Sequence, residues 1–182
     1  MKQPKSERHH TQQDLFPASP DPPANQSISI YRVSLVKDET VSFEQARLSN
    51  SQQAHTLIQN LIHTKGQPDR EQFVVALLNA KNDVIGLNIV SVGALSSAPV
   101  HPREVLKPAI LANSAAMILC HNHPSNDLQP SPDDIDITRK IIRAAEIIGI
   151  QVHEHLIINM ENDRYYSFAD QGIIKQIYAE IG

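Results

Sequence analysis

Apolar and polar residues alternate in the stretch SISIYRVSLVK, residues 27–37, which predicts a first, half-buried strand. Its apolar positions are Ile28, Ile30, Val33 and Leu35. The pattern then changes to helical spacing in SNSQQAHTLIQNLIH, where Ser49 or Ser51 is the candidate N-cap. The apolar stripe of this surface helix consists of Ala54, Leu57, Ile58 and Leu61. A strand followed by a helix that packs on a sheet is therefore expected.

Two further strands and an interrupted helix are predicted between residues 71 and 113. In EQFVVALLNAKNDVIGLNIVSVG, the turn residues 81–83 separate two β-rich runs, so this stretch predicts a hairpin with Glu71 at its mouth. HPREVLKPAILAN is expected to be helical in two pieces, because Pro102 suits a first turn whereas Pro108 breaks or restarts a helix.

The second half of the chain alternates strands and helices. AAMILC, residues 115–120, is wholly apolar and predicts a strand that is buried on both faces. SPDDIDITRKIIRAAEIIG predicts a helix that begins after Ser131 and stops at Gly149. QVHEHLIIN predicts another strand, and DQGIIKQIYAEI predicts a closing helix. We therefore expect an α/β fold in which helices flank both faces of a mixed β-sheet.

The composition favours one domain that is preceded by a tail. Residues 1–27 hold five prolines among polar neighbours and bury too little to fold, so a disordered tail over 1–27 and a domain over 28–182 are expected. Cys120 has no partner for a disulfide, and no leader or long apolar run is present, which favours the cytoplasm and argues against a membrane. The net charge of −4 disfavours nucleic acid as a partner, although a local basic patch is compatible with it.

The chemistry-bearing residues are concentrated in HNHPSNDLQPSPDD, residues 121–134, directly after the apolar strand. Each has a structural explanation, since Ser131 and Asp134 match a capping box and histidines at a strand end serve as hydrogen-bonded fillers. Taken together, these residues also match a set of metal ligands. His121 and His123 leave the same face of a strand, and the turn-rich loop after them lets Asp134 join them. Two imidazoles and one carboxylate are the ligands of a catalytic zinc site with an open position.

The spacing His121-x-His123, seven residues, Ser131, two residues and Asp134 matches the motif of the JAB/MPN metalloenzymes, and the chain resembles their RadC-type branch. The resemblance runs from about residue 28 to residue 180 and includes EQFVVALLNAKNDVIG and HLIINMENDRYYSF. It implies a JAB/MPN (cytidine-deaminase-like) α-β-α architecture. It also implies one zinc ion per chain, held by the two histidines and Asp134, with Glu71 as general base and Ser131 as a donor to the oxyanion.

Two positions depart from the RadC-type pattern without removing a ligand. Asn126 replaces the usual glycine of the loop and tolerates left-handed backbone angles, and Glu154 replaces an aspartate. His153 and His155 form a rival His-x-His pair, but Glu154 between them would point to the opposite face. We expect His155 to support the site and His153 to be exposed. Cys120 is expected to be a core thiol rather than a nucleophile.

The resemblance implies a zinc-dependent hydrolase of metallopeptidase or isopeptidase type, which uses water activated by zinc to cleave an amide bond. The expected partner is a peptide or isopeptide substrate. Two alternatives stay open, namely a DNA-repair-associated accessory protein and a catalytically silent, zinc-containing interaction module. The Pro-rich tail stands where full-length relatives carry a helix-hairpin-helix module, so a short form is expected. The sequence assigns no natural substrate, no oligomeric state and no role to His101.

Overall fold

The computed structural model of the protein describes residues 28–40, 42–43, 47–93 and 100–181. The elements along the chain are α1 (Ser51–Lys65), β1 (Gln72–Leu78), β2 (Val84–Val92), α2 (Pro102–Leu111), β3 (Ala116–Asn122), α3 (Pro132–Ile148), β4 (Gln151–Ile158), β5 (Tyr165–Ser167) and α4 (Ile173–Ile181). The expected tail at residues 1–27 lies outside the described residues. The domain boundary at residue 28 stays a prediction.

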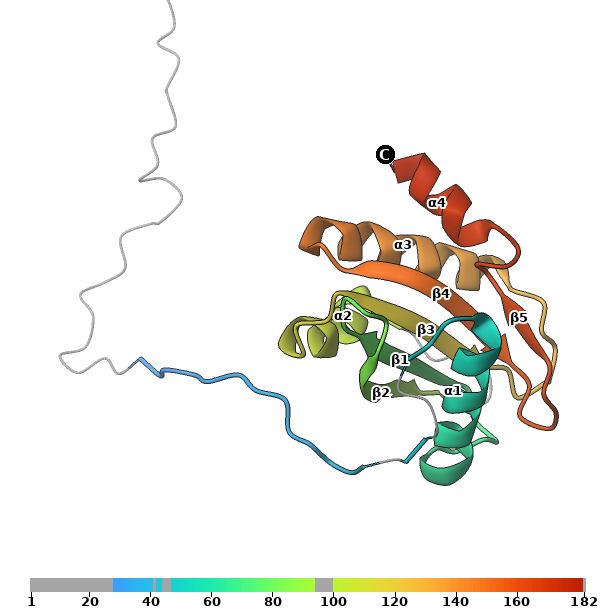
Figure 1. The fold of residues 1–182 in the computed structure, drawn as a ribbon, viewed down its shortest axis with the longest axis horizontal. Helices are drawn as coiled ribbons and strands as arrows, with labels where there is room; N and C mark the ends of the chain where they lie inside the picture. The colour runs from blue at the N-terminus through green and yellow to red at the C-terminus, as the bar shows by residue number, and fades with distance from the viewer. Residues whose placement is uncertain (1–27, 41, 44–46, 94–99, 182) are drawn as a thin grey trace, which may run out of the picture. The chain divides into compact units, whose positions relative to one another are not determined.

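The strands form one mixed sheet in the order β2-β1-β3-β4-β5 (Figure 1). β1 runs antiparallel to both β2 and β3, and β4 runs antiparallel to β5. β3 and β4 are parallel, and α3 is the helix that connects them. The start of α3 therefore lies near the carboxyl end of β3, which is where α/β folds commonly build their sites. The predicted mixed sheet is confirmed.

Helices cover both faces of the sheet, and each face has its own apolar cluster. One cluster combines alternate residues of the central strands with α2, α3 and α4, and the other combines the intervening residues with α1. In β1, Phe73, Val75 and Leu77 belong to the first cluster, and the residues between them belong to the second. All of β1 and β3 is buried, as expected for strands covered on both faces. The predicted α-β-α layering is confirmed.

The predicted first strand is wrong. Residues 28–40 have no regular secondary structure, and the side chains of Ile28 and Ile30 are 92% and 98% exposed. Alternation identifies a face that a strand would bury, but a strand also needs a neighbouring strand for its backbone hydrogen bonds. β5, in contrast, was not predicted from the sequence. It is a three-residue strand that pairs with β4 and is too short to show a sequence pattern.

Two helices differ in detail from their prediction. α1 begins after Asn50, whose side chain accepts a hydrogen bond from the Gln53 N–H, so neither predicted serine is the N-cap. α2 is one continuous helix with Pro108 inside it, not two pieces. Pro108 removes a single backbone donor, while Val105 and Ala109 pack in the core, so tertiary packing outweighs the local break. Among the described helices, none combines the length and the hydrophobicity needed to cross a membrane.

Candidate metal centre

β3 carries two ligand candidates to its carboxyl end. His121 belongs to the strand and is 1% exposed, and His123 follows the strand directly. The Nε2 atoms of the two rings are 2.9 Å apart, so both side chains leave the same face, as predicted. Asn122 faces the other way, where its side-chain oxygen accepts a hydrogen bond from the Gln72 N–H at 3.0 Å. That bond holds the end of β3 against β1.

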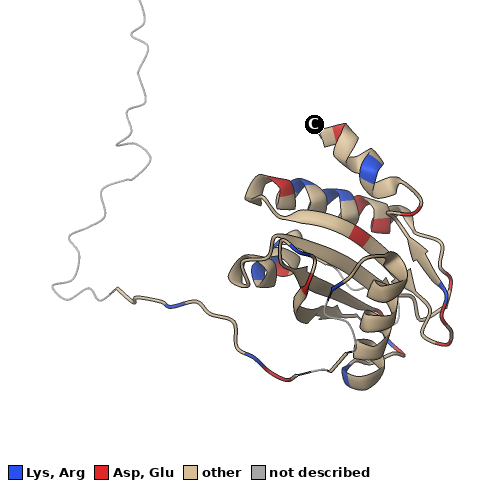
Figure 2. Cartoon of the chain, in the orientation of Figure 1, with Lys and Arg blue, Asp and Glu red and all other residues tan. Residues whose placement is uncertain are grey.

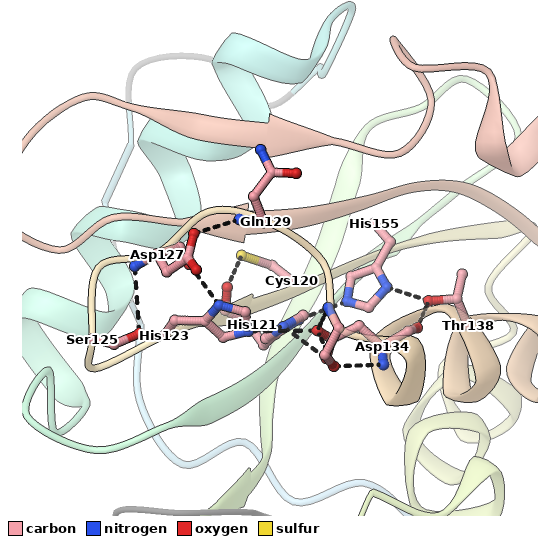
Figure 3. A network of polar contacts seen from close by, with 10 residues as sticks. Cys120, His121, His123, Ser125, Asp127, Gln129, Asp134, Thr138 and His155 are labelled. Carbon is pink, nitrogen blue, oxygen red and sulfur yellow. Dashed lines mark hydrogen bonds and ion pairs between the residues drawn. The ribbon is translucent and has the colours of Figure 1, made fainter.

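Asp134 completes the cluster from the first turn of α3 (Figure 3). Its Oδ1 atom is 3.2 Å from His121 Nε2, and its Oδ2 atom is 3.6 Å from His123 Nε2. The predicted capping box is present, because the Asp134 N–H donates to Ser131 Oγ. In return, the backbone N–H and the hydroxyl of Ser131 both donate to Asp134 Oδ2 at 2.7 Å. The helix cap therefore orients the carboxylate beside the histidines.

The loop between β3 and α3 fixes the ring of His123. His123 Nδ1 is 2.6 Å from the carbonyl oxygen of Asp127. Because a carbonyl oxygen only accepts, Nδ1 carries the hydrogen in a neutral ring and Nε2 keeps a free lone pair. The backbone N–H of Asn126 donates to the His123 carbonyl at 2.9 Å, and Asn126 has a φ of 58°. Asn126 thus adopts the left-handed backbone that the sequence analysis expected it to tolerate.

The donor set fits a divalent ion such as zinc. His121, His123 and Asp134 each offer one ligand atom, and these atoms lie within 4.8 Å of one another. Two ligand atoms that are each about 2.0–2.1 Å from a tetrahedral zinc ion lie about 3.3 Å apart. The 2.9 Å between the two Nε2 atoms and the 3.2 Å between His121 Nε2 and Asp134 Oδ1 are close to that value, and the 3.6 Å contact of His123 Nε2 is with the other oxygen, Asp134 Oδ2. Two imidazoles and a carboxylate would also leave one tetrahedral position open.

The cluster favours the ionised form of its carboxylate. Burial alone would raise the pKa of Asp134, but its contacts with His121 and His123 hold this pKa well below its usual range. The same contact with Asp134 raises the pKa of His123, although burial of the ring acts in the opposite direction. Metal ligands bind as carboxylate and as neutral imidazole, so a metal ion and a proton compete for His123.

Of the two predicted catalytic residues, Ser131 contacts this cluster directly, whereas Glu71 acts on it through its charge. Glu71 is half-buried just before β1, and its backbone carbonyl accepts a hydrogen bond from the Gly93 N–H at 2.8 Å. Its negative charge adds to the effects that raise the pKa of His123. The hydroxyl of Ser131 contacts Asp134 in the capping box. The roles of Glu71 as base and Ser131 as oxyanion donor stay predictions.

The sequence analysis also named three further histidines and a cysteine, and these residues have different surroundings. His155 Nε2 is 2.8 Å from His121 Nδ1, as expected for a supporting residue. His153 is half-buried, so its expected exposure is wrong, and its Nε2 is 3.2 Å from a side-chain oxygen of the β1–β2 turn. His101 is the exposed residue before α2. Cys120 is buried, and burial raises the pKa of its thiol, as expected in a core.

Sequence reasoning missed the role of Thr138 and the buried environment of Glu154. Thr138 Oγ1 is 2.6 Å from His155 Nδ1. Thr138 follows Asp134 by four residues on one helix face, and this spacing is the signal that points to it. The Glu154 side chain accepts four hydrogen bonds on the opposite face of the sheet, and burial raises its pKa. A charged residue in a strand carries no local signal that it is buried.

Known proteins share this part of the chain. A family model described as a RadC-like JAB domain matches residues 48–173. A protein of Rubrobacter xylanophilus named UPF0758 protein is 49% identical over 106 residues, which are 58% of this chain and 45% of that protein. A protein of Desulfitobacterium hafniense with the same name is 50% identical over 106 residues, which are 58% of this chain and 46% of that protein. The match therefore spans less than half the length of these curated relatives.

Proposed function

This chain belongs to the RadC-like JAB domain family, and we propose that it is a zinc-dependent hydrolase that cleaves an amide bond in a peptide or an isopeptide. The observation that carries the proposal is the cluster of His121, His123 and Asp134, whose ligand atoms lie within 4.8 Å of one another. Structural zinc sites are normally closed by four protein ligands, whereas catalytic sites use three and keep one position open. The three-residue set therefore favours catalysis over a structural role.

Each residue at the site has a defined task in this proposal. A zinc ion held by the cluster would lower the pKa of a water molecule and polarise a carbonyl group. The Glu71 carboxylate takes the proton of the attacking water and passes it to the leaving amine. The Ser131 hydroxyl turns from Asp134 toward the oxygen on which negative charge develops. The Ser131 N–H remains on Asp134 Oδ2, so the ligand keeps its orientation when the hydroxyl turns.

The distribution of charge favours this reaction over a DNA-repair-associated role. Lys and Arg are interspersed with Asp and Glu along α3 (Figure 2), where Lys140 pairs with Asp136 at 2.6 Å. The net charge of the chain is −4. Proteins that bind a phosphate backbone concentrate positive charge on one surface. Binding of an amide substrate does not require positive charge that is concentrated on one surface.

The experiment that tests the proposal measures zinc and hydrolysis separately. Zinc-loaded wild type is screened against fluorogenic peptide and isopeptide libraries, and its zinc content is measured by elemental analysis. Glu71→Gln keeps the shape of the side chain but cannot accept the proton. This variant should therefore retain its zinc and its fold, while turnover falls by about a hundredfold to ten-thousandfold.

The matched control is Glu161→Gln, which makes the same change at an exposed glutamate in the β4–β5 turn and should behave as wild type. Loss of zinc from Glu71→Gln would make Glu71 a ligand or a support instead of the base. Full zinc content in wild type without hydrolysis of any library member would favour the silent module. Steeply salt-dependent DNA binding would favour the accessory protein.

A further inference from the structure

His155 and Thr138 link two ligand candidates through a continuous chain of hydrogen bonds (Figure 3). His121 Nδ1 is 2.8 Å from His155 Nε2, and His155 Nδ1 is 2.6 Å from Thr138 Oγ1. The Thr138 hydroxyl then donates to the backbone carbonyl of Asp134. The chain therefore runs from β3 through β4 to α3. All three side chains that form it are at most 1% exposed, so bulk water does not compete for these bonds.

The carbonyl at the end of the chain sets the direction of every hydrogen bond in it. A carbonyl oxygen only accepts, so the Thr138 hydrogen points to Asp134 and the Thr138 oxygen accepts from His155 Nδ1–H. Because burial disfavours a charged imidazolium, His155 is neutral and carries no hydrogen on Nε2. His155 Nε2 must then accept a hydrogen bond from His121 Nδ1–H. A neutral His121 with its hydrogen on Nδ1 has a free lone pair on Nε2.

We propose that Thr138 and His155 are positioning residues that hold His121 in the tautomer whose Nε2 atom can bind a metal ion. This inference rests on the proposed zinc centre and deepens it. His121 Nε2 is the atom that lies 2.9 Å from His123 Nε2 and 3.2 Å from Asp134 Oδ1. Asp134 thus acts twice, with its carboxylate as a ligand and with its carbonyl as the anchor of the chain.

The two histidines are oriented by the same principle over different distances. The Asp127 carbonyl contacts His123 Nδ1 directly at 2.6 Å, whereas the Asp134 carbonyl acts on His121 through Thr138 and His155. The longer hydrogen-bond chain, which orients His121, depends on the Thr138 hydroxyl. Without the Thr138 hydroxyl, His155 is free to carry its hydrogen on Nε2 and donate it to His121 Nδ1. The hydrogen of His121 then moves to Nε2 and blocks the metal position.

The test compares Thr138→Val, which keeps the branched shape and loses the hydroxyl, with Thr138→Ser, which keeps the hydroxyl. Zinc affinity is measured at constant pH by competition with a chromophoric chelator. Thr138→Val should bind zinc about 10–100-fold more weakly than wild type, whereas Thr138→Ser should restore binding to within about threefold. Thr56→Val is the matched control, because Thr56 makes the same hydroxyl-to-carbonyl bond on the exposed side of α1, to Gln52 at 3.0 Å, and should have no effect.

A second measurement tests the hydrogen-bond chain in the zinc-free wild-type protein, without any substitution. Nitrogen NMR of the imidazole rings in zinc-free wild type should show a hydrogen on Nδ1 of both His121 and His155, and none on His155 Nε2. A hydrogen on His155 Nε2 would overturn the inference, and so would equal zinc affinities of Thr138→Val and Thr138→Ser. If wild type binds no zinc, the proposed centre fails, and the tautomer measurement still decides whether the chain is correct.

Discussion

Glu154 and His155 are neighbours on β4, yet their side chains lie on opposite faces of the sheet and have different surroundings. Both are at most 4% exposed. The Glu154 carboxylate accepts hydrogen bonds from the hydroxyls of Ser51 at 2.7 Å and Ser167 at 2.5 Å. It also accepts from the backbone N–H groups of His155 at 2.8 Å and Ala169 at 3.0 Å. These donors belong to α1, β4, β5 and the turn after β5, so Glu154 joins elements of the fold.

The contacts of His155 lead instead to His121, whose Nε2 atom can bind a metal ion. The chain of hydrogen bonds through His155 starts at the Asp134 carbonyl and ends at His121 Nδ1. The Nε2 atom of the same His121 ring faces two further ligand candidates. Burial and polarity are alike at the two positions. The network around His155 therefore leaves a lone pair of His121 directed at other ligand candidates, whereas the hydrogen bonds of Glu154 only join elements of the fold.

The largest effect is expected when a ligand candidate is removed from the face of the sheet that carries His155. His123→Ala deletes one of three proposed ligands, so zinc affinity should fall by about a thousandfold or more. Glu154→Gln changes the other face and should leave zinc content as in wild type. Elemental analysis after dialysis measures both variants. Full zinc occupancy in His123→Ala would contradict the ligand assignment.

The second prediction concerns stability on the Glu154 face. Glu154→Ala leaves four donors without this acceptor, two in buried and two in part-buried hydrogen bonds, so the free energy of unfolding should fall by about 2–4 kcal/mol. Urea denaturation of the zinc-free protein measures this change, and Glu161→Ala, at an exposed position, should cost close to nothing. An unchanged midpoint in Glu154→Ala would show that these hydrogen bonds are replaced at no cost.

The third prediction concerns pH and again separates the two faces. Contact with Asp134 raises the pKa of His123, so His123 binds a proton below this raised pKa and releases it above. Zinc binds the neutral ring, and its affinity should therefore fall about tenfold per pH unit below that pKa and level off above it. Chelator competition between about pH 6 and about pH 8 measures the curve. Glu154→Gln should follow the wild-type curve, and an affinity independent of pH would show that no proton is displaced.

The smallest expected effect is the stability of Glu154→Gln as a function of pH. Burial raises the pKa of Glu154 in the folded state, so its stabilising contribution is present below the unfolded pKa and is lost as pH rises through the folded pKa. Gln does not titrate. The melting temperature of Glu154→Gln relative to wild type should therefore rise between about pH 4 and about pH 7, by less than about 5 °C. A fall over this range would mean that the four hydrogen-bond donors lower the pKa of Glu154 by more than burial raises it.

Local spacing in the sequence predicted most of the cluster of His121, His123 and Asp134. His121 and His123 are two residues apart in a strand and therefore share a face, whatever the strand pairs with. Ser131 and Asp134 are three apart at a helix start, which is the spacing of a capping box. The apolar patterns also predicted α1, the β1–β2 hairpin, β3, α3, β4 and α4. The strand expected over residues 27–37 is not formed in its described part, residues 28–37, because its pairing depends on a distant neighbour, which no local pattern specifies.

The sequence pointed to His155 as a support of the cluster, but the strand register that turns His155 toward the cluster is a feature of the tertiary structure alone. Met117 of β3 pairs with Val152, but the next residue, Ile118, pairs with Glu154, so His153 is an extra residue in β4. Val152 packs on the face that carries the cluster, and unbroken alternation would place Glu154 on that face. The irregularity reverses this order and turns His155 toward the candidate metal centre. Its cause is backbone pairing and packing between two strands far apart in sequence, and a pattern of neighbouring residues contains no information about that register.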